Sequence, residues 1–165
     1  MIQFGSWLPD QHEIFAPHLR QAKNVIPKAN GYLPFRQLSA VSGVLADRVR
    51  GAAAFRDEDG TVHVYAADGT KLYELNGGAT WDDVSRSVGG AYTTSLTSRW
   101  RFTQFGDFCI GTNFDDAVQV KTMSTAGLFA NLTGSPPKGK HIATFRDFVV
   151  LGYTDTSASQ LAWSA

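Results

Sequence analysis

A short motif that recurs after forty residues constrains the fold of this chain more than any other feature. Residues 105–111 and 145–152 both begin with Phe-x-Asp-Phe and continue with apolar residues and a glycine. Phe55-Arg56-Asp57 is a weaker instance, fifty residues before the first of them. A turn at the x-Asp pair, between an alternating strand and an apolar strand, explains the pattern. Self-similarity at this spacing indicates repeated β-sheet units.

Residues 50–85 show what one such unit contains. Short apolar or alternating stretches predict strands at residues 50–56, 61–66, 71–75 and 80–85. Asp59-Gly60 and Asp68-Gly69 separate the first three, and glycine tolerates the positive φ that a primed two-residue turn requires. We therefore predict a four-stranded antiparallel meander with two-residue turns at both Asp-Gly pairs.

The two full copies of the motif predict further units of the same kind. Strands are expected around residues 99–105, 108–111, 117–122 and 128–132, and again around 141–145, 148–152 and 160–163. About forty residues and four strands per unit match a β-propeller blade. The predicted fold is therefore all-β, with residues 47–165 forming the first two blades and part of a third. A β-sandwich is the alternative. Since closed propellers have about four to eight blades, we expect the sequence to be the N-terminal portion of a longer chain.

Residues 1–46 have a different character and predict an extended, Pro-rich N-terminal arm. They hold four of the six prolines, and proline fixes φ and favours an extended residue before it. Apolar side chains on such an arm bury little against one another, so we expect them to contact the propeller or a neighbouring subunit. These residues are Ile14, Phe15, Val25, Ile26, Tyr32, Leu33 and Phe35.

Charge and composition exclude several classes of protein. Fifteen Lys and Arg balance fifteen Asp and Glu, which argues against a general binder of nucleic acid or anionic membranes. No apolar stretch approaches the ~20 residues of a membrane span, so no membrane insertion is expected. The single cysteine, Cys109, lies in an apolar run and is interpreted as a small core residue.

The sequence predicts no catalytic, cofactor or metal site. Asp82-Asp83 and Asp115-Asp116 are paired carboxylates, but neighbours on a strand point to opposite faces, which favours turn and edge solvation. The four histidines lack metal-ligand spacing, and no nucleophile or phosphate-loop motif occurs. We therefore expect a protein that is not an enzyme.

A group of basic residues has two interpretations. Arg99, Arg101, Lys138 and Lys140 are candidates for contact with DNA phosphates in a central channel. The alternative, which we favour, is solvated charge at the rim.

Residues 76–81 resemble a variant of the Asp-box, a hairpin that recurs in sialidase-type propellers. The Gly-x-Thr-Trp half is present, while Glu74 and Asn76 replace the Ser and Asp of that motif. We expect a polar side chain that bonds its own turn and a tryptophan that covers a blade edge. Together with the repeat, this gives seven structural blade residues: Trp81, Trp100, Phe105, Asp107, Phe145, Asp147 and Trp163. Their aromatic members are interpreted as inter-sheet core; a sugar-binding face is the alternative.

Taken in order along the chain, several segments resemble the packaged-DNA stabilisation, or tail nozzle (tail hub), β-propeller proteins of short-tailed bacteriophages. The segments are residues 22–27, 31–34, 64–73, 81–85, 99–107, 145–152 and 163–165. The resemblance implies a structural virion protein, assembled in the host bacterial cytoplasm and located in the virion tail. It implies a homo-oligomeric ring, a hexamer, below the portal and adaptor, with tail fibres or distal tail proteins as further partners. Such a ring retains packaged double-stranded DNA and conducts it on ejection without sequence specificity.

Two other functions remain open. A sialidase-like or polysaccharide-depolymerase propeller needs an arginine cluster and a Tyr or carboxylate pair at the ring centre. Arg56 and Arg146 recur after phenylalanine, but Gly106 takes that place in the middle unit and breaks the pattern. A protein-interaction propeller has the same repeats and forms no ring of subunits.

Overall fold

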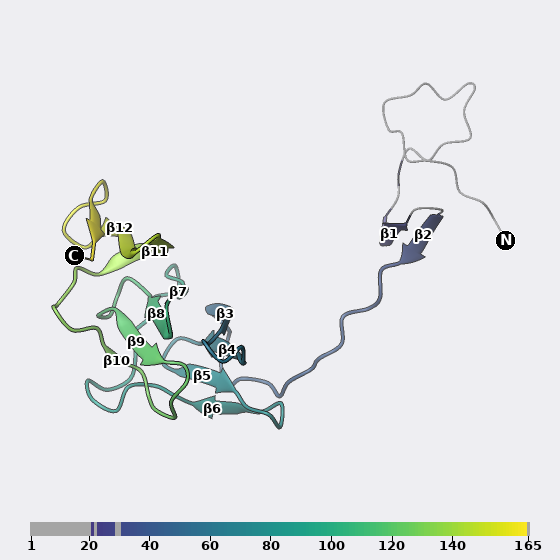
Figure 1. Ribbon diagram of the computed structural model, residues 1–165, viewed down its shortest axis with the longest axis horizontal. Coiled ribbons are helices and arrows are strands. Elements are labelled where there is room, and N and C mark those ends of the chain that lie inside the picture. The colour runs from purple at the N-terminus through teal and green to yellow at the C-terminus, as the bar shows by residue number, and fades with distance from the viewer. Residues whose placement is uncertain (1–20, 22, 29–30, 165) are drawn as a thin grey trace, which may run out of the picture. The chain divides into compact units, whose positions relative to one another are not determined.

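The computed structural model describes residues 21, 23–28 and 31–164 and contains no helix within them (Figure 1). The chain divides into two units, Met1–Ala40 and Val41–Ala165. Residues 41–46, which the sequence assigned to the arm, group with the second unit. A backbone hydrogen bond ties them to this unit, because the Gly43 N–H donates to the Ala79 carbonyl at 2.9 Å.

The described part of the first unit contains a β-hairpin. Strand β1 (Val25–Lys28) pairs antiparallel with β2 (Gly31–Pro34). Prolines are tolerated here because both strands of a two-stranded sheet are edges, where a missing N–H costs no ladder bond. The predicted arm residues Val25, Ile26, Tyr32 and Leu33 lie in this hairpin and Phe35 follows it, whereas Ile14 and Phe15 lie outside the described residues.

The second unit consists of three antiparallel sheets in chain order. The first sheet contains β3 (Gly51–Arg56), β4 (Val62–Ala67), β5 (Leu72–Leu75) and β6 (Trp81–Asp83). The second contains β7 (Arg101–Phe105), β8 (Phe108–Thr112), β9 (Gln119–Thr122) and β10 (Ala130–Asn131). The third contains β11 (Gly139–Phe145), β12 (Phe148–Thr154) and β13 (Leu161–Trp163). The all-β, antiparallel prediction is confirmed, and none of these sheets closes on itself.

The predicted two-residue turns at the Asp-Gly pairs are wrong. Arg56 pairs with Val62 and Ala67 with Leu72, so the connections span residues 57–61 and 68–71. Gly60 does have a positive φ, of 87°.

The second connection needs no left-handed glycine because an aspartate side chain holds it. The Asp68 carboxylate accepts from the backbone N–H groups of Thr70 and Lys71 at 2.6 and 2.7 Å. An aspartate that bonds its own backbone in this way mimics a turn.

The recurring motif, by contrast, does form two-residue turns. Phe105 pairs with Phe108 and Phe145 with Phe148, which leaves only the x-Asp pair between the strands. The first turn residue has a positive φ in both copies, 54° at Gly106 and 51° at Arg146. Positive φ at the first position only is the φ pattern of a type II′ turn. The repeat found in the sequence therefore marks one repeated backbone structure.

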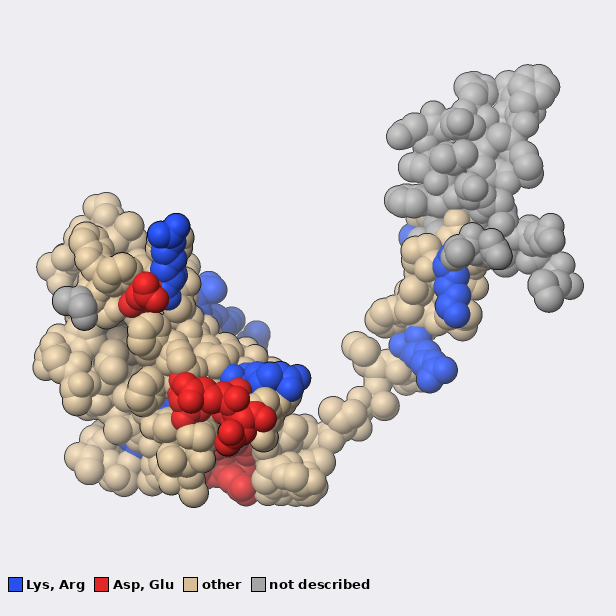
Figure 2. Space-filling model, viewed as in Figure 1, with Lys and Arg blue, Asp and Glu red and all other residues tan. Residues whose placement is uncertain are grey.

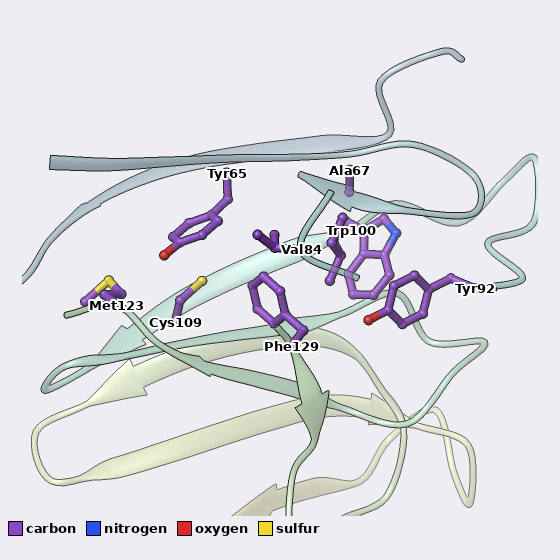
Figure 3. Close-up of a cluster of buried hydrophobic side chains, with 9 residues drawn as sticks. Tyr65, Ala67, Val84, Tyr92, Trp100, Cys109, Met123 and Phe129 are labelled. Carbon is purple, nitrogen blue, oxygen red and sulfur yellow. The ribbon is translucent and has the colours of Figure 1, made fainter. Parts of the chain in front are cut away.

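The three sheets pack face to face in series. A first core cluster lies between the first two sheets, where Tyr65 on β4 points toward Cys109, Met123 and Phe129 (Figure 3). A second core cluster, which includes Ile110, joins the second sheet to the third. The second sheet is therefore covered on both faces, unlike a layer of a two-layer sandwich. Cys109 is fully buried in the first cluster, which confirms its interpretation as a core residue.

Hydrogen bonds repeat along the stack as well. The first strand of each sheet lies beside the first strand of the next, β3 beside β7 and β7 beside β11. The Gln104 side-chain amide donates to the Arg56 carbonyl, and the Thr144 hydroxyl donates to the Gln104 carbonyl, both at 2.6 Å. Gln104 and Thr144 are forty residues apart, so the same position of the repeat contacts the preceding sheet each time.

The two turns of the motif make a matched pair for mutation. Gly106→Ala places a Cβ on a left-handed residue and is expected to lower the free energy of unfolding by about 1 kcal/mol. Arg146→Gly removes such a Cβ and is expected to raise it, by less than about 1 kcal/mol because glycine adds entropy to the unfolded chain. Urea unfolding of both variants checks this. Equal losses in the two variants would contradict the equivalence of the turns.

Candidate functional site

The structural blade residues of the second sheet lie in or beside the cores. Trp100 is buried in the first core cluster, and Phe105 packs against the second. Asp107 accepts from the backbone N–H and hydroxyl of Ser124, and its carbonyl accepts from the Met123 N–H at 2.9 Å. This side chain therefore ties the motif turn to the segment after β9.

The Asp-box-like turn is held by its own Asn76 side chain, as predicted. The Asn76 side-chain oxygen accepts from the N–H groups of Gly78 and Thr80 at 2.9 and 3.1 Å. Half-buried Trp81 donates its indole N–H to the Gly43 carbonyl at 2.9 Å. The motif therefore has a structural role, which is to hold the chain that enters the first sheet.

In the third sheet, the aromatic residues that were predicted to lie in an inter-sheet core are exposed. Phe145 and Trp163 are 67% and 69% exposed, and Asp147 lies in the exposed turn between β11 and β12. Phe105, the counterpart of Phe145, has a following sheet to pack against. Among the described residues no further sheet lies on the outward face of the third.

Among the described residues, the largest group of ion-paired side chains connects the first two sheets. The two ring nitrogens of His63 meet two carboxylates, Nδ1 with Glu74 Oε1 at 2.7 Å and Nε2 with Asp57 Oδ2 at 3.0 Å. The other Glu74 oxygen lies 3.2 Å from Nζ of Lys121, whose side chain is 3% exposed. The His63 ring stacks on that of Tyr65, with centroids 6.3 Å apart. These four charged residues, His63, Asp57, Glu74 and Lys121, form the charged cluster.

The geometry of the charged cluster favours a protonated histidine. Partial burial of His63 opposes the charge, but the hydrogen bonds to Glu74 and Asp57 outweigh it and raise the pKa of the ring. The same hydrogen bond from His63 lowers the pKa of Asp57. Only an imidazolium can donate from both nitrogens at once, so a neutral ring loses one of the two bonds.

Sequence reasoning missed the charged cluster because its members are far apart. Glu74 lies on β5 and Lys121 on β9 of the next sheet, so only the stacking of sheets brings them together. The one signal available was the alternation of side chains along a strand, which places His63 and Tyr65 on the same face of β4.

A second ion pair corrects the interpretation of Asp116 as a solvated edge residue. Asp116 is buried, and its carboxylate accepts from Arg86 at 2.9 Å and from the Thr93 N–H at 2.9 Å. Burial acts against the anion, but hydrogen bonds from the Thr93 N–H, Asn113 and Arg86 lower the pKa of Asp116. The Arg86 guanidinium also lies over the Tyr92 ring, 4.5 Å from its centroid. The pair therefore fastens the long connection between β6 and β7 to the connection between β8 and β9 of the second sheet.

The two adjacent aspartates of β6 have separate partners. Asp82 accepts from the Asn76 amide at 3.0 Å, whereas Asp83 meets the Lys71 ammonium at 2.7 Å. Their side chains therefore have different partners, in keeping with the alternation of neighbouring residues along a strand.

Three of the four basic residues with a possible DNA role come together. Arg99, Arg101 and Lys140 line one small pocket, beside Asn113 and Phe114. Lys138 instead donates to the Asp115 carbonyl at 2.6 Å. Most of the face of the second unit seen in Figure 2 is uncharged, with basic and acidic side chains side by side. The charge distribution on this face is that of a mixed surface without an extended basic track.

Comparison with known proteins assigns no family. No protein-family model matches the chain, and no curated protein matches it. Within residues 21, 23–28 and 31–164, no group of three or more His, Cys, Asp or Glu side chains is arranged to hold a metal ion. The same residues include no helix that is long and apolar enough to cross a membrane.

The charged cluster predicts a stability difference that depends on pH. Because the folded pKa of His63 is raised, its stabilisation is complete below the ordinary histidine pKa and is lost as pH rises through the folded value. His63→Gln is therefore expected to cost more free energy of unfolding at about pH 5.5 than at about pH 8.5. Denaturant unfolding at both pH values measures this. His141→Gln, on an exposed histidine of β11, is the control, and a cost of His63→Gln that does not change with pH would contradict the protonated ring.

The Arg86–Asp116 pair predicts a large loss from a single truncation. Arg86→Ala leaves a buried carboxylate without its counter-charge and is expected to lower the free energy of unfolding by about 3 kcal/mol. Arg99→Ala is the matched control, since exposed Arg99 donates to the backbone carbonyls of Leu96 and Ser98. Thermal or urea unfolding distinguishes the two. Equal losses of unfolding free energy in Arg86→Ala and Arg99→Ala would contradict a large contribution of the Arg86–Asp116 pair to stability.

Proposed function

We propose that this chain is part of a β-propeller that serves as a structural protein of a phage tail, the nozzle ring that retains packaged DNA and conducts it on ejection. The single observation that carries the proposal is the serial stacking of the three sheets with their first strands side by side. A propeller places blades around an axis in this way, and each blade is covered by its neighbours. The resemblance of the sequence to tail nozzle proteins supplies the identity of the assembly.

A mechanical role fits the chemistry that the structure brings together. The charged cluster joins the first two sheets, and the Arg86–Asp116 pair joins a connection to the second sheet. Both place opposite charges in contact between segments of one fold, which resists separation of those segments. A ring under pressure from packaged DNA requires such stiffness between its sheets. We therefore propose a structural protein that is not an enzyme.

The hairpin unit supports a role in assembly. Ile26, Leu33 and Phe35 are exposed apolar residues of the first unit, at 46%, 42% and 55%. Apolar side chains grouped on a small exposed hairpin are typical of surfaces that bind another protein. In the proposed nozzle, they bind neighbouring subunits or the adaptor above the ring.

The proposal places the protein in the virion, and electron microscopy tests this. Antibodies raised against residues 41–164 and carried on gold are expected to label the tails of virions from the phage that encodes the chain. Deletion of residues 1–35 removes the whole β1–β2 hairpin and is expected to abolish that label while the remaining protein still folds, as judged by circular dichroism. Virions of the unaltered phage without label at the tail would overturn the proposal. Turnover of sialosides or capsule polysaccharide by the purified protein would favour the enzyme alternative instead.

A further inference from the structure

Two basic side chains meet at one end of the interface between the second and third sheets. The Thr103 hydroxyl on β7 lies 2.9 Å from the Thr144 hydroxyl on β11, so these two faces of the strands point toward each other. Because side chains alternate along a strand, Arg101 shares the face of Thr103 at the start of β7, and Lys140 shares the face of Thr144 near the start of β11. The interface therefore begins with two positive charges, one from each sheet.

A small pocket opens between these charges. Its basic lining residues are Arg99, Arg101 and Lys140, and no Asp or Glu lines it. None of the ion pairs between described residues includes any of the three. The pocket volume is about 60 Å³, well below the ~300–1,000 Å³ of sites for drug-sized molecules, so it has room for a small ion or a single charged group. Like charges this close repel one another unless an anion lies between them.

The carboxylates that adjoin the pocket in the chain are held by other partners. Asp115 and Asp116 directly follow Phe114, which lines the pocket. The Asp115 carboxylate accepts from the Ser95 N–H at 2.8 Å, and the Asp116 carboxylate accepts from Arg86. These contacts leave the three basic side chains to an anion from outside the chain.

Aromatic residues hold the lysine at the pocket. Phe114 and Tyr153 both have a positive φ, 72° and 56°, which is uncommon for aromatic residues. Their rings meet edge to face with centroids 5.6 Å apart, and the Lys140 ammonium lies 4.9 Å from the centroid of the Tyr153 ring. Backbone in such sparsely populated conformations is concentrated at binding sites and similar functional positions. The lysine is therefore positioned by a ring, which leaves its charge without a carboxylate partner.

The corresponding place in the first interface is closed. By the spacing of the motif, Arg101 corresponds to Gly51, fifty residues earlier, and the counterpart of Lys140 is Trp100, forty residues earlier. A Cβ on Gly51 would lie only 2.4 Å from the Trp100 carbonyl oxygen, so the two strands are in direct contact there. Stacking of these sheets therefore requires neither a pocket nor paired cations at this position. The basic pocket is a property of the second interface alone.

We propose that this pocket binds a phosphate group, as the free ion or as part of a larger molecule, through Arg99, Arg101 and Lys140. Guanidinium groups bind phosphate oxygens with paired N–H donors, and an ammonium adds a point charge. Arg99 donates to carbonyls of its own loop through Nη1 only, which leaves its other N–H groups for the ligand. Three cations match the roughly two negative charges and the several acceptor oxygens of phosphate better than the single charge of a carboxylate. The proposal goes beyond the nozzle function and does not depend on it.

Calorimetric titration of the full chain with inorganic phosphate tests the site. At low ionic strength the chain is expected to bind one phosphate, with a Kd no weaker than about 1 mM. Arg101→Gln and Lys140→Gln are each expected to weaken binding about tenfold or more, since each removes a charged hydrogen-bond donor. Arg146→Gln is the control, because it removes the same charge from an exposed turn outside the pocket, and it is expected to bind as the wild type does. All three residues are exposed, and circular dichroism verifies that the variants fold.

Two results would overturn the proposal. One is a wild-type chain that binds no phosphate up to about 10 mM. The other is an equal loss of binding in Arg146→Gln and in the pocket variants, which would indicate an adventitious ion only, attracted by the overall charge.

Competition with a short DNA duplex identifies the source of the phosphate group. Displacement of inorganic phosphate from the wild-type chain, but not from Arg146→Gln alone, would support the site and assign it to the phosphates of a nucleic-acid backbone. Phosphate that stays bound in the presence of the duplex would support the site as one for the free ion or a terminal phosphate group. Absence of phosphate binding leaves the nozzle proposal to the antibody labelling of virion tails, so the two can fail separately.

Discussion

A small antiparallel meander has two faces, and it cannot bury both of them alone. The first and second sheets each have four short strands, so each depends on a neighbour for its hydrophobic contacts. Stacking solves this for the second sheet, whose two faces are covered by the first and second core clusters. In the third sheet, by contrast, Phe145, Leu161 and Trp163 are exposed, because among the described residues no further sheet covers them.

Stacking also decides where charged residues can be buried. Lys121 is almost fully buried, and a buried ammonium requires a partner; Glu74 on the neighbouring sheet supplies it at 3.2 Å. Glu74 in turn joins His63, and His63 joins Asp57 at the end of the first hairpin. A chain of alternating charges therefore runs from one sheet to the next. Its geometry fixes how the two sheets align, in addition to the apolar contacts beside it.

The proposed nozzle function combines the stacked sheets with a resemblance in sequence, and it assigns assembly to the hairpin of β1 and β2. It makes use of surfaces rather than of a catalytic centre, in keeping with charged groups that pair with one another inside the fold.

The sequence by itself determined the repeated unit: the four strands of the first meander, the two-residue turns at Gly106-Asp107 and Arg146-Asp147, and the self-bonded turn at Asn76. These features depend on residues close together in the chain, through turn chemistry and alternation. Only the tertiary structure decided the rest. It placed the Asp68 side chain in a longer turn, buried Asp116 against Arg86, and joined His63 and Glu74 to Lys121, because these contacts depend on distances between segments that no local pattern encodes. It also decided that Phe105 is packed and Phe145 exposed, since a shared local motif gives similar strands but cannot say whether a neighbouring sheet covers them.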